Sequence, residues 1–257
     1  MLAQALAIAT AITDEDARAR ALSALAEHLP PDLLAQALAT AAAITDDSAR
    51  AEALTALAPR LPPEQQADIL AQALATATAT AITDDYSRAD VLTALAPHLP
   101  PEQQASVLAQ ALAATTAITD DYARPEALSA MAEHLPRDLL TQALATAAAI
   151  TGDSARAEAL TALAEHLPSD LLGQALAAIP KESIQAITAL LDRGQSILSS
   201  ERNGTLLGLL RTSLAGIDRI SCLSIITVMA PTIAEIGGTG AIQECIKAIA
   251  DIHRWWP

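Results

Sequence analysis

The sequence predicts an all-α protein in which tandem helical hairpins stack into a solenoid. The first observation is composition: hydrophobic residues make up 52% of the 257 residues, but aromatic residues only 2%. Ala and Leu therefore supply most of the apolar surface. Ala has the highest helix propensity, and its small side chain lets neighbouring helices approach closely. The other observations are a repeated apolar pattern and two repeated markers at the expected helix ends.

The pattern Leu-x-Gln-Ala-Leu begins at Leu2, Leu34, Leu70, Leu108, Leu140 and Leu172, in steps of 32, 36, 38, 32 and 32 residues. A Thr and a Leu-Pro pair follow in each of the first five units, and the Pro lies 17 residues after the Thr every time. Such self-similarity is typical of repeat proteins. We expect about five and a half two-helix units over residues 1–180 and a non-repetitive helical capping region over residues 181–257.

Each unit is expected to contain two helices, named helix A and helix B. Helix A opens with one or two Pro and an acidic residue, which suit a first turn. Its apolar face follows the helical spacing, as in Leu34, Ala37, Leu38 and Ala41. Helix B is expected over about residues 48–58 of the second unit. Neither helix can hide its apolar face alone, so neighbouring units must stack.

The unequal steps identify helix A as the variable element. Four extra residues precede Leu70 and Leu108, which is about one helical turn, so helix A should lengthen while its buried face stays in phase. An extra Ala-Thr within residues 75–80 should bulge at the end of that helix. Helix B keeps its length.

One unit departs from the pattern at Pro125, where other units have Ala51 or Ala89. Proline inside a helix removes a backbone donor and costs about 3 kcal/mol. We therefore expect helix B of that unit to start a few residues late, with Asp121 or Tyr122 near its cap.

After residue 180 the repeat is lost, and helices are expected at about residues 181–193, 200–213, 217–229 and 240–254. Trp255 and Trp256 are expected to cover the last apolar face. No comparable cap precedes Leu2, so we expect the natural protein to continue upstream, with this chain as its C-terminal part.

Charge and cysteine content exclude several functional classes. Acidic residues outnumber basic ones 30 to 15, a formal net charge of −15, and such a surface repels nucleic acids and anionic membranes. Cys222 and Cys245 cannot form a disulfide framework, which favours a reduced compartment. No stretch reaches the ~20 apolar residues of a membrane span, and no secretory signal is present. We expect a cytoplasmic protein.

The phrase Ala-Ile-Thr-Asp-Asp-x-Ala-Arg-x-Glu-Ala-Leu-x-Ala-Leu-Ala-x-His-Leu-Pro-Pro-Glu resembles degenerate TPR/HEAT-type repeats. Such repeats lie C-terminal to NTPase modules in large bacterial signalling proteins of the STAND class, the NACHT and NB-ARC members. The closing Ile-Ala-Asp-Ile-His-Arg-Trp-Trp-Pro also looks like the terminus of such chains. The resemblance implies a right-handed α-solenoid that acts as a sensor or protein-binding arm, often linked to defence. No Gly-x-x-x-x-Gly-Lys-[Ser/Thr] motif occurs, so ATPase activity is not assigned to these residues.

Three columns of polar residues recur through the repeats. The arginine column is Arg18, Arg50, Arg88, Arg124 and Arg156. These residues could grip carboxylates of a partner, but an i, i+4 pair with the preceding Asp, or a bridge to the next repeat, is favoured. The glutamine column is Gln4, Gln36, Gln72, Gln110, Gln142 and Gln174. It could be a polar ligand track, but hydrogen bonds between adjacent helices are favoured.

The histidine column is His28, His98, His134 and His166, with Arg60 in the second unit. Equivalent positions lie roughly 10 Å apart, too far to share a zinc ion. The histidines are therefore interpreted as solvated helix ends, and no metal is expected. Helix caps explain Gly237-Gly238-Thr239-Gly240 better than a phosphate cradle does.

A further column, Asp16, Ser48, Tyr86, Tyr122 and Ser154, varies freely. Tyrosine is favoured at interface hot spots, so Tyr86 and Tyr122, with the neighbouring Arg88 and Arg124, are the candidate partner-binding residues. The alternative is that the tyrosines pack on the preceding loop.

No nucleophile and base can be placed together, so no catalytic residue or cofactor is expected. The favoured function is the binding of a protein or peptide by the C-terminal sensor arm of a larger bacterial protein. The alternative from another class is a structural spacer or self-assembly scaffold without a dedicated ligand. An enzyme within residues 181–257 is disfavoured.

Overall fold

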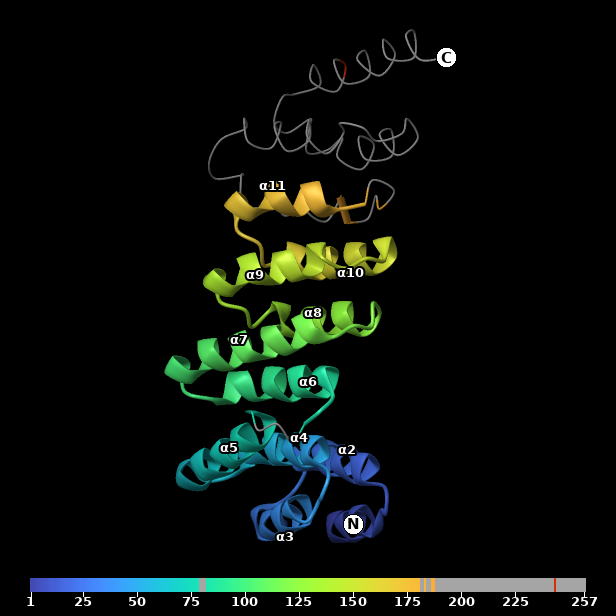
Figure 1. Ribbon diagram of the computed structural model, residues 1–257. Coiled ribbons are helices and arrows are strands. Elements are labelled where there is room, and N and C mark those ends of the chain that lie inside the picture. The colour runs from blue at the N-terminus through green and yellow to red at the C-terminus, as the bar shows by residue number, and fades with distance from the viewer. Residues whose placement is uncertain (79–81, 181–182, 184–185, 188–242, 244–257) are drawn as a thin grey trace. The chain divides into compact units, whose positions relative to one another are not determined.

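The structure, a computed structural model, confirms an all-helical fold for the part of the chain that it describes (Figure 1). The described residues are 1–78, 82–180, 183, 186–187 and 243. Two compact units divide the chain, residues 1–136 and residues 137–257, and each is treated by itself. This division does not test the expected boundary at residue 180. No helix among the described residues is long and apolar enough to cross a membrane.

Helix A and helix B alternate along the chain. In unit 1 the helices are α1 (Leu2–Ala11), α2 (Glu15–Ala26), α3 (Pro31–Ala42), α4 (Asp47–Leu57), η1 (Ala58–Arg60), α5 (Pro63–Thr78), α6 (Asp85–Leu95), η2 (Ala96–His98), α7 (Pro101–Ala117) and α8 (Ala123–Ala132). In unit 2 they are α9 (Arg137–Ala148), α10 (Asp153–Ala164) and α11 (Ser169–Ala178). Odd-numbered α-helices are helix A and even-numbered ones helix B. The cysteines, the tryptophans and nearly all of the expected C-terminal helices lie outside the described residues.

Helix boundaries follow the repeated markers. Proline is the first residue of α3, α5 and α7, where its missing N–H has no helical partner to lose. An Asp side chain caps helix B: Asp14, Asp46 and Asp84 each accept a hydrogen bond from the backbone N–H three residues later, at 2.7–2.8 Å. The chain therefore turns sharply from helix A to helix B.

Repeated columns of apolar residues form the core, and three of them come from the sequence markers. The first Leu of the five-residue pattern is buried from the second occurrence onward, and the Ala of the pattern is fully buried in α3, α5, α7, α9 and α11. The Leu of each Leu-Pro pair is also buried. Alanine at the fully buried positions lets helix backbones approach closely, so the excess of Ala in the composition follows from the packing.

The variation in helix length confirms that helix A is the adjustable element. Helices α5 and α7 have 16 and 17 residues, whereas α3 and α9 have 12. The five B helices have between 10 and 12 residues. The expected bulge after Ala-Thr falls on residues 79–81, which lie outside the described residues.

The expected late start of the helix that contains Pro125 is also confirmed. Tyr122 is the N-cap of α8, and the Asp120 carboxylate accepts hydrogen bonds from the N–H groups of Tyr122 and Ala123, at 2.7 and 3.0 Å. Pro125 is the third residue of α8 and is buried. In the first turn a proline interrupts no intrahelical hydrogen bond, so α8 tolerates it.

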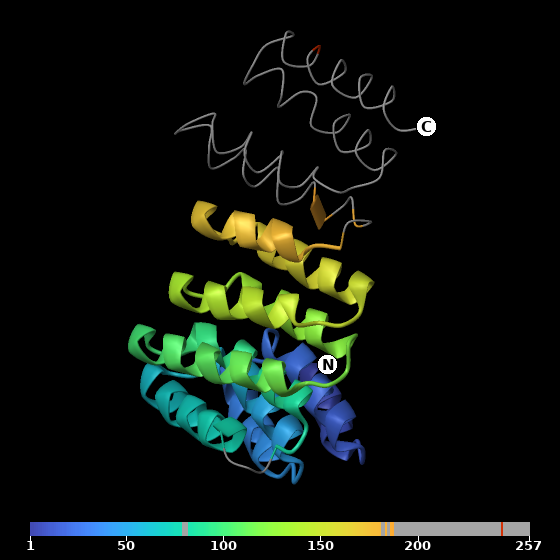
Figure 2. The same cartoon turned by 45° about the horizontal axis from the view of Figure 1, so that its top comes forward.

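Within unit 1 the B helices form a continuous row in which α2 contacts α4, α4 contacts α6, and α6 contacts α8 (Figure 2). Each of α5 and α7 also packs on the B helix of the hairpin before it, α4 and α6 respectively. In unit 2, α9, α10 and α11 contact one another. Successive hairpins in unit 1 therefore share their apolar surfaces.

The recurring arginines hold the joint between helix A and helix B. Each guanidinium donates a hydrogen bond to the carbonyl of the Ile six residues earlier: Arg18 to Ile12, Arg50 to Ile44, Arg88 to Ile82, Arg124 to Ile118 and Arg156 to Ile150. The expected i, i+4 pairing is wrong. Arg18, Arg50, Arg88 and Arg156 pair instead with the acid three residues earlier, since the Asp four residues earlier caps the helix where one is present.

The Glu15 side chain links the first hairpin to the connection within the second. The Glu15 carboxylate accepts hydrogen bonds from the Thr45 hydroxyl at 2.8 Å, the Thr45 N–H at 3.1 Å and the Asp46 N–H at 2.6 Å. These bonds lower the pKa of Glu15 below its ordinary value. The later units have Asp at this position, one methylene shorter. At this position Asp47, Asp85 and Asp153 form ion pairs with the Arg of their own units.

Replacing Arg50 by Lys should destabilise unit 1 although the positive charge is kept. The two terminal nitrogens of the Arg50 guanidinium contact the Ile44 carbonyl and the Asp47 carboxylate. The single ammonium of a lysine cannot reproduce this geometry. We expect a loss of about 1–3 kcal/mol in the free energy of unfolding, measured by urea denaturation. The matched control is Arg20→Lys, because the Arg20 side chain is exposed. An equal loss of unfolding free energy in both variants would contradict a special role of the Arg50 hydrogen bond to Ile44.

Candidate functional site

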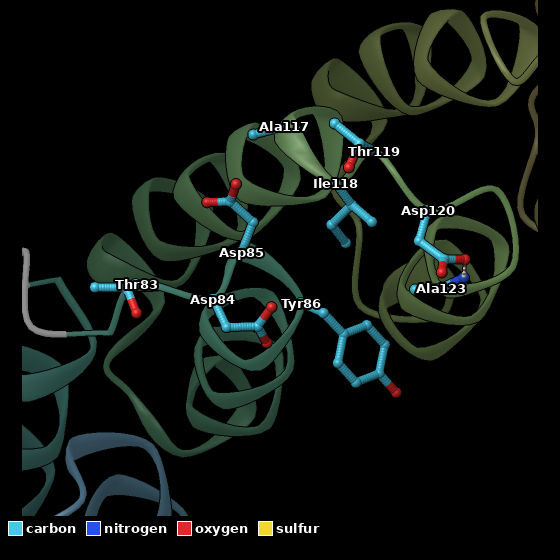
Figure 3. A pocket seen from close by; sticks show the side chains of 9 residues that line it. All are labelled: Thr83, Asp84, Asp85, Tyr86, Ala117, Ile118, Thr119, Asp120 and Ala123. Carbon is cyan, nitrogen blue, oxygen red and sulfur yellow. Dashed lines mark hydrogen bonds between the residues drawn. The ribbon is translucent and has the colours of Figure 1, made fainter.

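A surface cleft of about 450 Å³ lies where α7 ends and α6 and α8 begin. Its lining is Thr83, Asp84, Asp85, Tyr86, Ala117, Ile118, Thr119, Asp120 and Ala123 (Figure 3). All of these residues come from connections between helix A and helix B or from the adjacent helix ends, and all belong to unit 1. The cleft is therefore formed by the joints of two successive hairpins.

Tyr86 is the one aromatic side chain that lines the cleft. Figure 3 shows its ring extending from the first turn of α6 toward that of α8. The ring packs against a small apolar cluster formed by Ala89, Ala114, Ile118 and Ala127. The Glu126 carboxylate of α8 is the charged group that acts most strongly on its hydroxyl. Partial burial and then the negative charge of Glu126 raise the pKa of Tyr86 above its ordinary value of 10.0, so the hydroxyl stays protonated at neutral pH.

The cleft is negatively charged. Three aspartates line it, and none of its lining residues is basic. Hydrogen bonds from Ser87 lower the pKa of Asp84, and backbone N–H groups of Ala123 and Tyr122 lower the pKa of Asp120. Both carboxylates therefore remain ionised at neutral pH. A ligand that enters the cleft meets negative charge and one aromatic ring, a combination that favours cations.

The two candidate tyrosines have different environments. Tyr86 is half-buried, whereas Tyr122 is 87% exposed and does not line the cleft. Tyr86 packs against Ala89 of its own helix and Ala114, Ile118 and Ala127 of the following hairpin, which differs from the expected packing on the preceding loop. Tyr122 projects from the N-cap of α8 and remains accessible to a partner.

Arg88 and Arg124 are engaged within their own hairpins. Arg88 donates to the Ile82 carbonyl at 3.2 Å and pairs with Asp85 at 2.9 Å. Arg124 donates to the Ile118 carbonyl at 2.9 Å. Both guanidinium groups hold loops that line or adjoin the cleft, so their structural contribution is to position those loops.

A row of carboxylates on the B helices escaped the sequence analysis. The repeat position of Arg20 is occupied by Glu52, Asp90, Glu126 and Glu158 in the later units. Partial burial and then the charge of Asp90 raise the pKa of Glu52 above 4.5. The pKa of Asp90 is raised by desolvation and then by Glu126, although Asp90 as a residue is exposed. Aligning the units would have revealed this column.

The glutamine column does not bridge helices. All six side chains are exposed, and no hydrogen bond from them to a neighbouring helix occurs in the described part of the chain. The expectation of interhelical hydrogen bonds is therefore wrong, since these residues lie on the outer side of helix A. Three of the four histidines are likewise exposed at the ends of B helices. Among the described residues, no group of three His, Cys, Asp or Glu could hold a metal ion.

Comparison with known proteins leaves the family open. No protein-family model and no curated protein matches the chain. A solved structure that aligns with it is the crystal structure of Ton1535 from Thermococcus onnurineus NA1, over 97% of this chain and 95% of that chain. The sequence identity is 15% and the TM-score is 0.41, so this likeness carries no argument about fold or function.

Substituting each tyrosine should separate their structural roles. Tyr86→Ala removes the ring from the apolar cluster against which it packs. We expect a loss of about 1–3 kcal/mol in the free energy of unfolding. Tyr122→Ala should change it by less than about 0.5 kcal/mol, since the side chain is exposed. Urea denaturation followed by circular dichroism measures both, and equal effects would refute the assignment.

Replacing Glu52 by Gln should make stability less dependent on pH. Because the folded-state pKa of Glu52 is raised, its ionisation destabilises the fold as pH rises through that value. Glu52→Gln should therefore raise the urea midpoint at neutral pH, and the gain should vanish below the ordinary pKa of 4.5.

The control for this effect is Glu158→Gln, the same repeat position in α10, where the side chain is exposed. The urea midpoints of both variants and the wild type are compared at pH values from acidic to neutral. A stabilisation by Glu52→Gln that persists undiminished at low pH would rule out the ionisation of Glu52 as its cause.

Proposed function

We propose that this chain is a non-enzymatic repeat module that binds a protein or peptide, and that the Tyr86 cleft is its contact site. The observation that carries the proposal is the cleft itself, which combines an aromatic wall with three carboxylates and lies between two successive hairpins. Peptide-binding surfaces commonly use an aromatic side chain as an anchor within a polar surround.

The architecture we propose is a right-handed α-solenoid of the TPR/HEAT type. The pairwise contacts between consecutive B helices in unit 1 support it. The resemblance of the repeat phrase to the helical arms of STAND proteins supports a place as the C-terminal sensor arm of a larger cytoplasmic bacterial protein. In that setting, capture of a partner by the arm would control the upstream domains.

The chemistry of the cleft selects the class of partner. Asp84, Asp85 and Asp120 line it without a basic residue, and the whole chain carries a net charge of −15. Arg or Lys side chains of a bound segment add positive charge beside these carboxylates, which already accept hydrogen bonds from Ser87, Arg88 and the first N–H groups of α8. An alkyl stem or guanidinium can lie against the Tyr86 ring. Acidic segments and nucleic acids are repelled by the same charges.

Neutralising Asp85 should weaken the binding of a basic peptide. The probe is a fluorescein-labelled peptide of alternating Arg and Ser, compared with one of alternating Glu and Ser by fluorescence anisotropy. We expect the Arg peptide to bind more tightly, with an affinity that falls as salt rises. Asp85→Asn should reduce that affinity about two- to fivefold, the range for one exposed charge pair.

Asp153→Asn is the matched control for this experiment. Asp153 occupies the same helix position in α10 and pairs with Arg156 as Asp85 pairs with Arg88, but it does not line the cleft. Equal affinities for the two peptides, or equal effects of the two substitutions, would overturn the proposal.

A further inference from the structure

The connection between α3 and α4 shows which chemical group this repeat binds from outside its own hairpin. There the Thr45 hydroxyl, the Thr45 N–H and the Asp46 N–H all donate to one carboxylate, that of Glu15 in the preceding hairpin. These bonds lower the pKa of Glu15, although the Asp46 carboxylate belongs to the same connection. The connection is therefore a carboxylate site, and the neighbouring aspartate does not prevent its occupation.

The connection between α7 and α8, which lines the cleft, repeats this local arrangement. The Asp120 carboxylate accepts a hydrogen bond from the Ala123 N–H at 3.0 Å, as Asp46 accepts one from Ala49 at 2.8 Å. The Arg124 N–H donates to the Asp120 carbonyl at 3.2 Å, and the corresponding bond to Asp46 measures 2.9 Å. The first N–H of α8 is thus already satisfied by Asp120, and the shared bonds indicate similar backbone arrangements in the two connections.

The two connections differ in one respect, which is the carboxylate from the preceding hairpin. The residue at the Glu15 position is Asp85, which lines the cleft, is one methylene shorter and pairs with Arg88 of its own helix at 2.9 Å. In the part of the chain that the structure describes, the Thr119 hydroxyl and the N–H groups of Thr119 and Asp120 donate no hydrogen bond. Both residues line the same cleft as Asp85 (Figure 3). These three donors are therefore available to a ligand.

We propose that Thr119 and Asp120 form a carboxylate subsite, which receives one carboxylate of a bound segment while basic side chains of that segment lie beside Asp84 and Asp85. The ligand chemistry is that of the Glu15 contact, a carboxylate held by two backbone N–H groups and one hydroxyl. Capture of a carboxylate by backbone N–H groups is a recurring mode of peptide recognition. The inference rests on the proposed function and adds an anionic contact to it.

A single carboxylate is compatible with the acidic cleft. The charge of Asp85 is compensated by its ion pair with Arg88, and basic side chains of the bound segment supply further positive charge. Hydrogen bonds from N–H groups to an ionised acceptor are stronger than those to a neutral one. A wholly acidic segment has no basic side chains to offset the aspartates, so it is still repelled. The cleft therefore selects a segment that carries both signs of charge.

Three peptides of alternating Arg and Ser, labelled with fluorescein at the N-terminus, test the subsite by fluorescence anisotropy. The first ends in a free carboxylate, the second is amidated and has one Ser replaced by Glu, and the third is amidated with Gln at that position. Net charge alone predicts that the Gln peptide binds most tightly to a chain of charge −15.

We expect the opposite order. A carboxylate should raise the affinity about three- to tenfold over the Gln peptide, the range for a charge-assisted hydrogen bond at a partly exposed site. Tighter binding of the first peptide identifies a C-terminal carboxylate as the source, and tighter binding of the second identifies an acidic side chain. If neither binds more tightly than the Gln peptide, the subsite is overturned.

Asp85→Glu tests the subsite without a peptide. The longer acid should reach the donors of Thr119 and Asp120, as Glu15 reaches those of the α3–α4 connection, and their amide-proton resonances should move downfield. The preference for a carboxylate-bearing peptide should also disappear, because the subsite is filled. Asp153→Glu is the matched control: Asp153 has the same helix position and the same ion pair but does not line the cleft, so neither property should change.

Unchanged resonances of Thr119 and Asp120 in Asp85→Glu, or a carboxylate preference that survives this substitution, would each overturn the subsite. Failure of the proposed function gives a different result, namely equal binding of the Arg-Ser and Glu-Ser peptides. The subsite alone fails if the Arg-Ser peptide still binds more tightly than the Glu-Ser peptide but shows no preference for a carboxylate.

Discussion

The hydrogen bond from the recurring arginine to the carbonyl of the preceding isoleucine fixes how each hairpin turns. The last carbonyls of a helix and the first N–H groups of the next have no partners of their own. At each joint the arginine supplies a donor to the first helix, and in the first four units an Asp carboxylate accepts a hydrogen bond from an N–H in the first turn of the second helix. Because these bonds are made within one hairpin, the joint does not depend on helix length further away. The N-terminal end of helix A can therefore vary while the row of B helices stays regular.

Most of the helical framework could be predicted because it depends on properties that are local in sequence. The prolines mark helix starts, the Leu and Ala columns mark buried faces, and Pro125 delays α8. The partners of the arginines could not be predicted in the same way. An acid three residues before Arg50 and another four before it lie within reach on the same helix face. The choice depends on which Asp is already engaged as the N-cap, and this becomes clear only from backbone geometry.

The candidate site illustrates the same limit. Tyr86 and Tyr122 occupy one repeat position, and nothing in their immediate neighbours separates them. Pro125 distinguishes the two tyrosines, because it delays the start of α8. Tyr122 therefore becomes the N-cap of α8, whereas Tyr86 lies within the first turn of α6. A ring in the first turn reaches the next hairpin, whereas a ring on the N-cap stays in solvent. The acidic character of the cleft could be predicted from the Thr-Asp-Asp sequences, but its enclosure by two joints could not.

The Glu15 clamp has a consequence for local motions. Its carboxylate holds the N–H groups of Thr45 and Asp46, which belong to the next hairpin's connection rather than to a helix. Backbone amides in such connections normally exchange their hydrogens with water quickly, because small openings free them. Here an opening must also release the Glu15 carboxylate, so exchange at these two amides reports on whether this side-chain contact between neighbouring hairpins is formed. The hydrogen-exchange rates of the Thr45 and Asp46 amides, in the connection between α3 and α4, therefore measure how often this contact opens.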